Sequence, residues 1–428
     1  MVLKDKTQVI FHSGILTIGG TVIEVRYNDD HIFFDFGSEY RPELDLPDEQ
    51  IQTLLKYRLI PQLNDVYDKR FELASTANQQ FKHTAVFLSH AHLDHSKMIN
   101  FLDCAIPLYA LKPTADILKS LNRDGAFLLP SPFNEPNYTR EITPLQPNSK
   151  IQIGQIEVEI VPVDHDAYGA AALLIRTPDK FLVYTGDLRL HGFDYELTEQ
   201  FIHKAQHPDM LMMEGVSISF DDKPKQPEIA TEQELIEKFK NLITHDSQRQ
   251  ITFNGYPANI KRFVKFIEAT AKAGRTLVLE AQMAALLKDI TNLDIPYYYI
   301  DHNNIPSLDA NLKMDYDELI QDETNYVIQI SPNQIPTLKG GGLYIHSDAQ
   351  PLGPFDPYYD IFLQQLHNQK VEFVRLAVSG HATPTDLDKI IAGIEPKLLV
   401  PIHTLKPEKL KNPFGERILP TRGQIITL

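Results

Sequence analysis

The stretch S-H-A-H-L-D-H, Ser89 to His95, decides how the rest of the chain is interpreted. It directly follows a short apolar run, which predicts a buried strand. Imidazole nitrogen and carboxylate oxygen are ligands that Zn²⁺ binds in proteins, at about 2.0–2.2 Å. Since residues i and i+2 of an extended segment point the same way, His90 and His92 can reach one ion. Asp94 and His95 come from the turn that follows and can face a second ion. Solvated surface histidines are the alternative, which so dense a group of ligand-type residues disfavours.

The composition is that of an ordinary globular enzyme. The chain has 428 residues, 43% hydrophobic and 23% charged, which predicts two or three domains or one large one. No apolar stretch is long enough to span a bilayer, and the N-terminus lacks the pattern of a signal peptide. The only cysteine, Cys104, excludes an intramolecular disulfide and is typical of a reducing compartment. We therefore expect a cytoplasmic protein without a membrane partner, whose metal ligands are histidine and carboxylate.

The net charge of −16 argues against a general nucleic-acid-binding surface, because phosphate contacts come from lysine and arginine. It does not exclude a local basic groove beside bound metal ions, which are themselves large local charges. Lys261, Arg262 and Lys265 could line such a channel, although a solvated helix face is the favoured interpretation of this charge run.

Three more ligand-type residues follow predicted strands in the next part of the chain. His165 follows an apolar run in V-P-V-D-H-D, after a segment 151–161 that is typical of one strand, and Asp187 ends V-Y-T-G-D. Glu214 ends the apolar run that begins at Met210. Alone, each is more typical of a structural histidine or a plain turn. A two-metal hydrolytic site, however, needs ligands from several loops, which favours the functional interpretation.

Asp164 and Asp166 flank His165 on either side. Carboxylates in such positions can orient metal-binding imidazoles. Solvated loop residues are the favoured interpretation of both.

The pattern changes after the charged, Pro-containing segment 221–227, which marks a probable boundary. Helices and strands then alternate as far as about residue 370, which predicts a parallel sheet with helices on both faces. Thr231 and Glu234 form a capping box for the first of these helices. We expect three segments: a first domain over 1–221, an inserted α/β domain over 222–370, and a return to the first domain over 371–428.

Ligand chemistry returns near the C-terminal end. His381 lies in S-G-H after a predicted strand, and His403 directly follows a predicted strand over 398–402. A helix with Thr383 as N-cap and Pro384 at its first position separates them, so both histidines are expected at the same edge of a parallel sheet. Each alone would be a structural histidine; together with the earlier candidates they favour a site.

These motifs, in order and spacing, resemble the metallo-β-lactamase superfamily, and more narrowly its β-CASP branch, which includes ribonuclease J and the mRNA 3′-end-processing endonucleases. The resemblance covers almost the whole chain. It rests on S-H-A-H-L-D-H, the later histidine and Gly-Asp pair, Glu214, S-G-H and P-I-H-T. It implies an αββα sandwich with the inserted parallel-sheet α/β domain as a lid.

The resemblance also implies roles for single residues. One Zn²⁺ would bind His90, His92 and His165, and a second would bind Asp94, His95 and His403, with Asp187 bridging them; Mn²⁺ is the alternative metal. Asp94, His381 and Glu214 form the implied catalytic set, in which Glu214 orients His381 as general acid toward the scissile phosphate.

Contacts with the substrate are predicted for Ser379 of S-G-H and for Ser347. Ser347 lies in H-S-D-A-Q-P-L-G, which is loosely similar to a phosphate-contacting loop of relatives.

Three functions are compatible with these motifs. The favoured one is a phosphodiesterase that cleaves RNA, with single-stranded DNA as a further substrate, by a hydroxide that two metal ions activate. The second is a hydrolase of a small ester, thioester or phosphodiester. The third is a non-catalytic RNA-binding subunit, which the complete set of ligand and acid residues disfavours. Assembly as a monomer or as a homodimer, and exonuclease or endonuclease action, stay open.

Overall fold

The chain forms two compact units in the computed structural model, residues 1–223 with 380–428 and residues 224–379. The structure describes residues 5–39, 41, 43–44, 46–63, 65–73, 83–133, 135, 137–220, 229–245, 248–300 and 305–428. The predicted boundary segment 221–227 lies outside these described residues. The second division lies at Ser379–Gly380, not at 370–371, because the strand after residue 371 pairs within the sheet of the second unit.

The first sheet of the first unit has the strand order β20-β1-β2-β3-β4-β5-β6. Strands β1 to β3 and β20 pair antiparallel, whereas β3 to β6 are parallel. The seven strands are β1 (Thr7–Ser13), β2 (Val22–Tyr27), β3 (Asp30–Phe34), β4 (His83–Phe87), β5 (Leu108–Leu111), β6 (Thr143–Leu145) and β20 (Ile425–Thr427).

The second sheet has the order β19-β18-β11-β10-β9-β8-β7 and changes from antiparallel to parallel at β10. The carboxyl ends of β10, β11 and β18 therefore lie at one edge of this sheet. The strands are β7 (Lys150–Ile153), β8 (Ile156–Pro162), β9 (Ala171–Arg176), β10 (Phe181–Tyr184), β11 (Met210–Glu214), β18 (Leu398–Ile402) and β19 (Glu416–Arg417).

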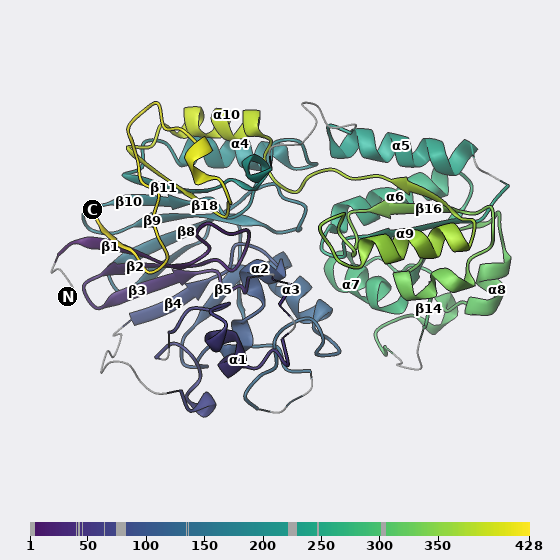
Figure 1. Cartoon of the computed structure of the whole chain (residues 1–428), viewed down its shortest axis with the longest axis horizontal. Coiled ribbons are helices and arrows are strands. Elements are labelled where there is room, and N and C mark those ends of the chain that lie inside the picture. Colours follow the sequence, from purple (N-terminus) through teal and green to yellow (C-terminus); the bar gives the residue numbers. More distant parts are fainter. Residues whose placement is uncertain are drawn as a thin grey trace. The chain divides into compact units, whose positions relative to one another are not determined.

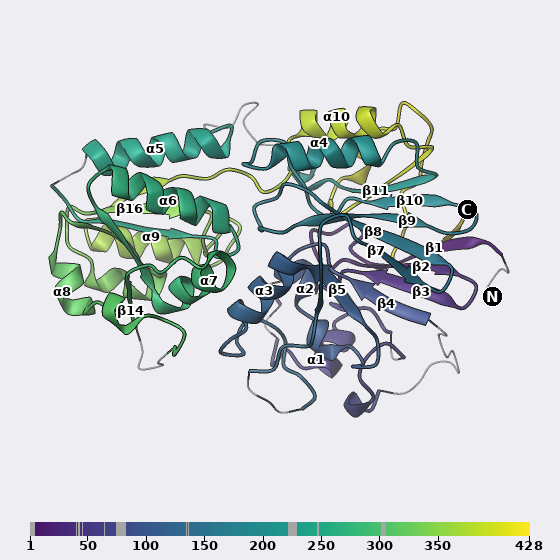
Figure 2. The ribbon, with the colours of Figure 1, turned by 180° about the vertical axis from the view of Figure 1, so that it is seen from behind.

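The two sheets pack face to face and bury a common core. Alternate residues of each strand enter it, such as Phe11 and Phe34 from the first sheet and Val158 and Met212 from the second. Helices cover the outer faces: α1 (Ile51–Lys56), α2 (Leu93–Ser96) and α3 (Lys112–Leu121) beside the first sheet, and α4 (Tyr195–Lys204) and α10 (Pro384–Ile394) beside the second (Figures 1 and 2). The first unit is thus the predicted αββα sandwich.

The second unit is an α/β fold around a sheet whose paired strands are all parallel, in the order β14-β13-β15-β12-β16-β17. This confirms the predicted parallel sheet. The strands are β12 (Ile251–Gly255), β13 (Thr276–Glu280), β14 (Tyr297–Tyr298), β15 (Tyr326–Gln329), β16 (Leu343–Ser347) and β17 (Glu372–Arg375). The helices are α5 (Glu232–His245), α6 (Ile260–Lys272), α7 (Ala281–Thr291), α8 (Tyr316–Gln321) and α9 (Tyr359–Asn368).

Both predicted N-caps are present, but the capping box predicted for Thr231 and Glu234 is incomplete, because the Glu234 carboxylate accepts from the Ala230 N–H and not from that of Thr231. The hydroxyl of Thr231 accepts a hydrogen bond from the Glu234 N–H at the start of α5, and Thr383 caps α10 in the same way. The single strand predicted over 151–161 is wrong: it is the hairpin β7–β8. The hairpin turns at Gly154, whose φ of +55° and close contact with Asp30 exclude a side chain.

Among the described residues, no helix combines the length and the apolar character that crossing a bilayer requires.

Candidate metal centre

Three of the candidate ligands of the first unit follow the ends of parallel strands, whereas His165 follows β8, which is antiparallel to its neighbours. β4 leads to His90, β10 to Asp187 and β18 to His403. His92 is the N-cap of the one-turn helix α2, which carries Asp94 and His95. The interior of a buried parallel strand is apolar, so polar side chains can follow only after the strand ends. The ligands therefore gather at the carboxyl ends of these strands.

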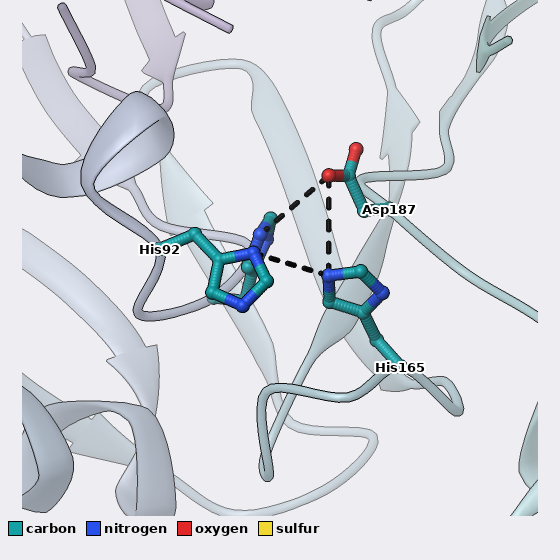
Figure 3. A group of neighbouring side chains, drawn as sticks. His92, His165 and Asp187 are labelled. Atoms are coloured by element: carbon teal, nitrogen blue, oxygen red, sulfur yellow. Dashed lines mark hydrogen bonds and ion pairs between the residues drawn. The ribbon is translucent and has the colours of Figure 1, made fainter. Parts of the chain in front are cut away.

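The described residues form three groups of possible ligand atoms here: two contain the ligands that the resemblance implied, and the third, Asp187, His381 and His403, overlaps with them. In each group all ligand atoms lie within 4.8 Å of one another. His90, His92, His165 and Asp187 make the first group, and Asp94, His95 and His403 make the second. The side chains of His92, His165 and Asp187 turn toward one another (Figure 3), with His92 Nδ1 3.3 Å from His165 Nε2.

Asp187 lies between the two groups. Its Oδ2 is 3.6 Å from His90 Nε2 in the first group, and 3.3 Å from His95 Nε2 and 3.6 Å from His403 Nε2 in the second. One oxygen atom is therefore close to ligand atoms of both groups, which is the position a bridging carboxylate needs.

The groups contain buried polar atoms that accept or donate no hydrogen bond within the described part of the chain. These atoms are His90 Nε2, His95 Nε2, His403 Nε2 and both carboxylate oxygens of Asp187. Burying so many unsatisfied polar atoms is costly unless something else binds them. Their nitrogen and oxygen chemistry and their convergence fit divalent metal ions.

The pKa values of His90, His165 and Asp187 favour the protonation states that metal ligands need, whereas burial of His95 is outweighed by the nearby Asp187 and Asp94, which raise its pKa above the usual range. Burial, together with the neighbouring imidazoles, lowers the pKa of His90 well below its usual range, and burial lowers that of His165 to about 3. Burial opposes ionisation of Asp187, but the surrounding histidines, His403 foremost, outweigh it and hold its pKa well below the usual value. Neutral imidazoles and an ionised carboxylate are the forms that bind metal.

Asp35, directly after β3, orients two of the imidazoles. His95 Nδ1 donates to Asp35 Oδ2 at 2.7 Å, which leaves Nε2 as the nitrogen that faces the site. The Ser89 hydroxyl donates to Asp35 and lies 2.9 Å from His90 Nδ1, so it can accept the proton of that nitrogen. The Ser89 N–H and the Tyr184 hydroxyl also donate to Asp35. Sequence reasoning assigned no role to Asp35, although an aspartate directly after a buried strand is the same signal that pointed to Asp187.

The other imidazoles are held differently. His165 Nδ1 donates to the carbonyl oxygen of Gly380, whereas His403 Nδ1 accepts from the Gly19 N–H at 3.2 Å. His403 has a φ of +49°, a left-handed backbone that side chains rarely adopt and that often marks a functional site.

Gly37 is required by the close approach of β3 and α2. A Cβ atom there would lie 1.6 Å from the carbonyl oxygen of Asp94. Any other residue would therefore displace the backbone that carries Asp94 and His95.

His381 lies beside the ligand groups and contacts Glu214. Its Nδ1 is 3.4 Å from Glu214 Oε1 and 3.7 Å from Asp187 Oδ2. Glu214 is fully buried and accepts a hydrogen bond from the Val216 N–H at 2.9 Å. Burial disfavours the charged form of His381, but Glu214 and then Asp187 outweigh it and raise its pKa to about 9. The arrangement therefore favours a protonated His381.

Asp164 and Asp166 are not the solvated loop residues that the sequence favoured. Asp164 is 3% exposed and lies 3.4 Å from the guanidinium of Arg189, and the side chain of Asp166 is 15% exposed. Both are held in place because the loop after β8 packs inward against the segment that follows β10 and against Gly380.

Ser347 and Ser379 belong to the second unit, so their contact with substrate stays a prediction. Within that unit Ser347 is buried and accepts from the guanidinium of Arg262. Arg262 is 1% exposed and binds Glu232 and Asp348, which excludes it from the solvated face and from an open basic channel. Lys265 pairs with Glu268 on the surface of α6, as expected for a solvated helix face.

The family described as Beta-lactamase superfamily domain matches residues 66–237. Among curated proteins, the chain is 22% identical to ribonuclease J of Sinorhizobium meliloti over 78% of this chain and 59% of that protein. It is also 22% identical to ribonuclease J of Pyrococcus abyssi, over 91% of this chain and 88% of that protein. The chain thus spans less than two thirds of the Sinorhizobium relative.

A solved structure resembles the whole chain. The crystal structure of a protein of unknown function from Enterococcus faecalis is 60% identical, with a TM-score of 0.94, over 99% of this chain and 100% of that chain. This likeness supports the two-unit architecture over the full length and carries no information about substrate.

Proposed function

The chain belongs to the metallo-β-lactamase superfamily, in its β-CASP branch, and on that premise we propose that it is a metal-dependent ribonuclease. The observation that carries the proposal is the convergence of two ligand groups on either side of Asp187. His90, His92 and His165 would hold one ion and Asp94, His95 and His403 the other. Two Zn²⁺ ions suit these imidazole and carboxylate donors.

The bound ions would lower the pKa of a water molecule and stabilise negative charge on the phosphoryl oxygens. The side chains of the protein would orient the metal ligands and would supply the proton for the leaving group. Asp35 holds His95 with its Nε2 toward the site. His381, kept protonated by Glu214, would donate a proton to the departing oxygen as general acid.

RNA is the proposed substrate because curated relatives that match most of this chain are named ribonuclease J. The net charge of −16 means that attraction of a polyanion must come from the metal ions and local groups rather than from the overall field. Ser347 and Ser379 are proposed contacts of the phosphate backbone. A cytoplasmic location and a homodimer remain predictions from the sequence.

Incubation of the purified protein with 5′-monophosphorylated linear RNA and with circular single-stranded RNA tests the proposal. Cleavage of at least one RNA, abolished by chelation and restored by metal, is the expected result. Cleavage of the linear form alone would indicate an exonuclease, and cleavage of both an endonuclease.

Failure to cleave either RNA in a protein that binds two ions would refute the ribonuclease proposal and favour a small ester or phosphodiester substrate. Failure to bind metal as well would favour a non-catalytic RNA-binding subunit.

A further inference from the structure

A groove in the second unit runs between α5 and the edge strand β17 and contains a cavity of about 400 Å³. Its α5 wall is one face of the helix, because the lining residues follow the i, i+3, i+4, i+7 spacing. These residues are Lys238, Asn241, Leu242 and His245. Val374, Arg375 and Leu376 form the opposite wall, and Ile229 completes the lining. Two regular elements therefore form most of the groove.

The groove-facing side of α5 is its accessible side. The other side of the helix packs beside α6, where Phe239 stacks on Phe266 with ring centroids 4.0 Å apart (Figures 1 and 2). On the groove side Asn241 and His245 are exposed and Leu242 is half-buried. Packing on α6 thus holds α5 in place and leaves this face open to a partner.

The strand β17 is an open edge of its sheet. It pairs with β16 on one side and with no strand on the other within the described part of the chain. The N–H groups of Glu372 and Leu376 donate to carbonyl oxygens of the segment 342–346. Because these directions alternate along a strand, the backbone groups of Phe373 and Arg375 point away from the sheet. The opposite edge, at β14, is covered by a β-bridge to the segment before α8, so β17 is the edge that can accept a strand.

The two sides of β17 differ in chemistry. Val374 faces the cavity, whereas Phe373 packs on the other side against Phe362 of α9, with ring centroids 5.9 Å apart. The guanidinium of Arg375 shares the side of Phe373: its Nη2 is 4.0 Å from the position that a Cβ atom on Gly353 would take. Arg375 is exposed and forms no ion pair or hydrogen bond within the described part of the chain. An added strand would therefore meet an apolar wall on one side and an uncompensated cation on the other.

We propose that β17 and the groove beside it bind an extended segment of a partner protein in which apolar residues alternate with acidic ones. The segment would pair with the outward N–H and C=O groups of β17. Its apolar side chains would enter the cavity, and its carboxylates would meet Arg375. The inference concerns only the second unit and depends on neither the metal centre nor the ribonuclease proposal.

The charge of the groove carries the acidic part of the proposal. The chain has a net charge of −16, yet the described residues that line the cavity include Lys238, His245 and Arg375 and no carboxylate. Of the carboxylates nearby, Glu234 pairs with Lys238, and Glu372 binds an arginine that precedes β12. A peptide fits this groove better than RNA does, because single-stranded RNA binds by stacking on aromatic side chains and this lining has none.

Selection from a displayed library of random peptides of about ten residues, on the full chain, tests the inference. We expect enriched peptides in which apolar and acidic residues alternate. Fluorescence anisotropy with the most enriched synthetic peptide should show that Arg375→Glu weakens binding at least about tenfold and that Arg375→Lys keeps most of it. Lys265→Glu, which reverses an exposed charge on α6, is the matched control and should bind the peptide as the unaltered protein does.

Two N-methylated versions of the peptide test the strand pairing. Methylation of one alternate set of amides should abolish binding and methylation of the other set should leave it intact, because only every second N–H of an added strand faces β17. Loss with both sets, loss with neither, or no enriched peptide would overturn the inference. Equal peptide binding by Arg375→Glu, with an unchanged thermal unfolding midpoint, would also overturn it. Single-stranded RNA binding that Arg375→Glu abolishes while peptide binding persists would assign the groove to nucleic acid instead.

Discussion

Asp35→Asn tests whether the carboxylate behind the metal centre sets the tautomer of His95. In the native protein Asp35 Oδ2 accepts from His95 Nδ1 at 2.7 Å, and Oδ1 accepts from the Ser89 N–H at 2.7 Å. If the asparagine keeps its oxygen toward Ser89, its NH₂ group faces His95 Nδ1. That nitrogen must then accept, so the proton moves to Nε2, the atom that would bind metal.

The expected magnitude follows from the number of ligands affected. Only the second group, with Asp94, His95 and His403, contains the misdirected nitrogen. Removing a partner that orients a ligand imidazole typically lowers metal affinity about 10- to 100-fold, or about 1.4–2.7 kcal/mol. The altered contacts to the Tyr184 hydroxyl and His95 should also lower the free energy of unfolding of the metal-free protein by about 1–3 kcal/mol.

Titration of metal-free protein with Zn²⁺ against a chelator of known affinity measures the effect. The native protein should bind two ions, and Asp35→Asn should bind one with native affinity and one more weakly. Asp116→Asn, which alters a partly exposed carboxylate paired with Lys112 on α3, serves as the control. Two ions bound with unchanged affinity by Asp35→Asn would show that Asp35 does not govern the tautomer of His95.

Three further predictions concern the general acid and the core of the first sheet. His381→Ala should keep both ions, measured by elemental analysis, and lose about 10²- to 10⁴-fold in turnover of RNA; loss of an ion would make His381 a ligand. Glu214→Gln removes a negative charge beside His381 and should lower its pKa, so the alkaline limb of the pH–rate profile should move to lower pH. Glu24 is fully buried and accepts from His12, His31 and Arg26, so Glu24→Gln should lower the free energy of unfolding by about 3 kcal/mol in urea titrations at pH 7. Burial opposes ionisation of Glu24, yet these three partners lower its pKa below the usual 4.5. The difference in the free energy of unfolding between the native protein and Glu24→Gln should therefore be full above pH 4.5 and should shrink as the pH falls below it. A difference in the free energy of unfolding that stays constant down to acid unfolding would contradict this.

Residues that follow apolar runs were found from the sequence because the signal is local. A buried strand must end before a polar ligand, so S-H-A-H-L-D-H, the Gly-Asp pair and P-I-H-T all stand out along the chain. The helix caps at Thr231 and Thr383 were predicted for the same reason, since capping depends on residues three positions apart.

Other features depend on contacts between distant segments. Arg262 resembled part of a solvated charge run, yet it is buried because Glu232 and Asp348 reach it from other elements. The turn at Gly154 was missed because its need for glycine comes from Asp30, which lies far away in the sequence. The helix α4 was also not predicted, although it packs Phe201 into the core of the first unit.

The sequence by itself determined the kinds of ligand residue and the parallel sheet of the second unit, because each follows from short-range spacing, whereas the αββα sandwich was implied by the family resemblance. One expectation was wrong: the strand before His381 is β17, which pairs with β16 in the second unit, so His381 and His403 do not follow neighbouring strands of one sheet. Only the tertiary structure decided that Asp187 Oδ2 lies within 3.6 Å of both His90 and His403, and that Asp35 accepts from His95 Nδ1 and so leaves His95 Nε2 facing the site. Those relations join residues on different strands, and their distances depend on sheet register and packing, which no local pattern encodes.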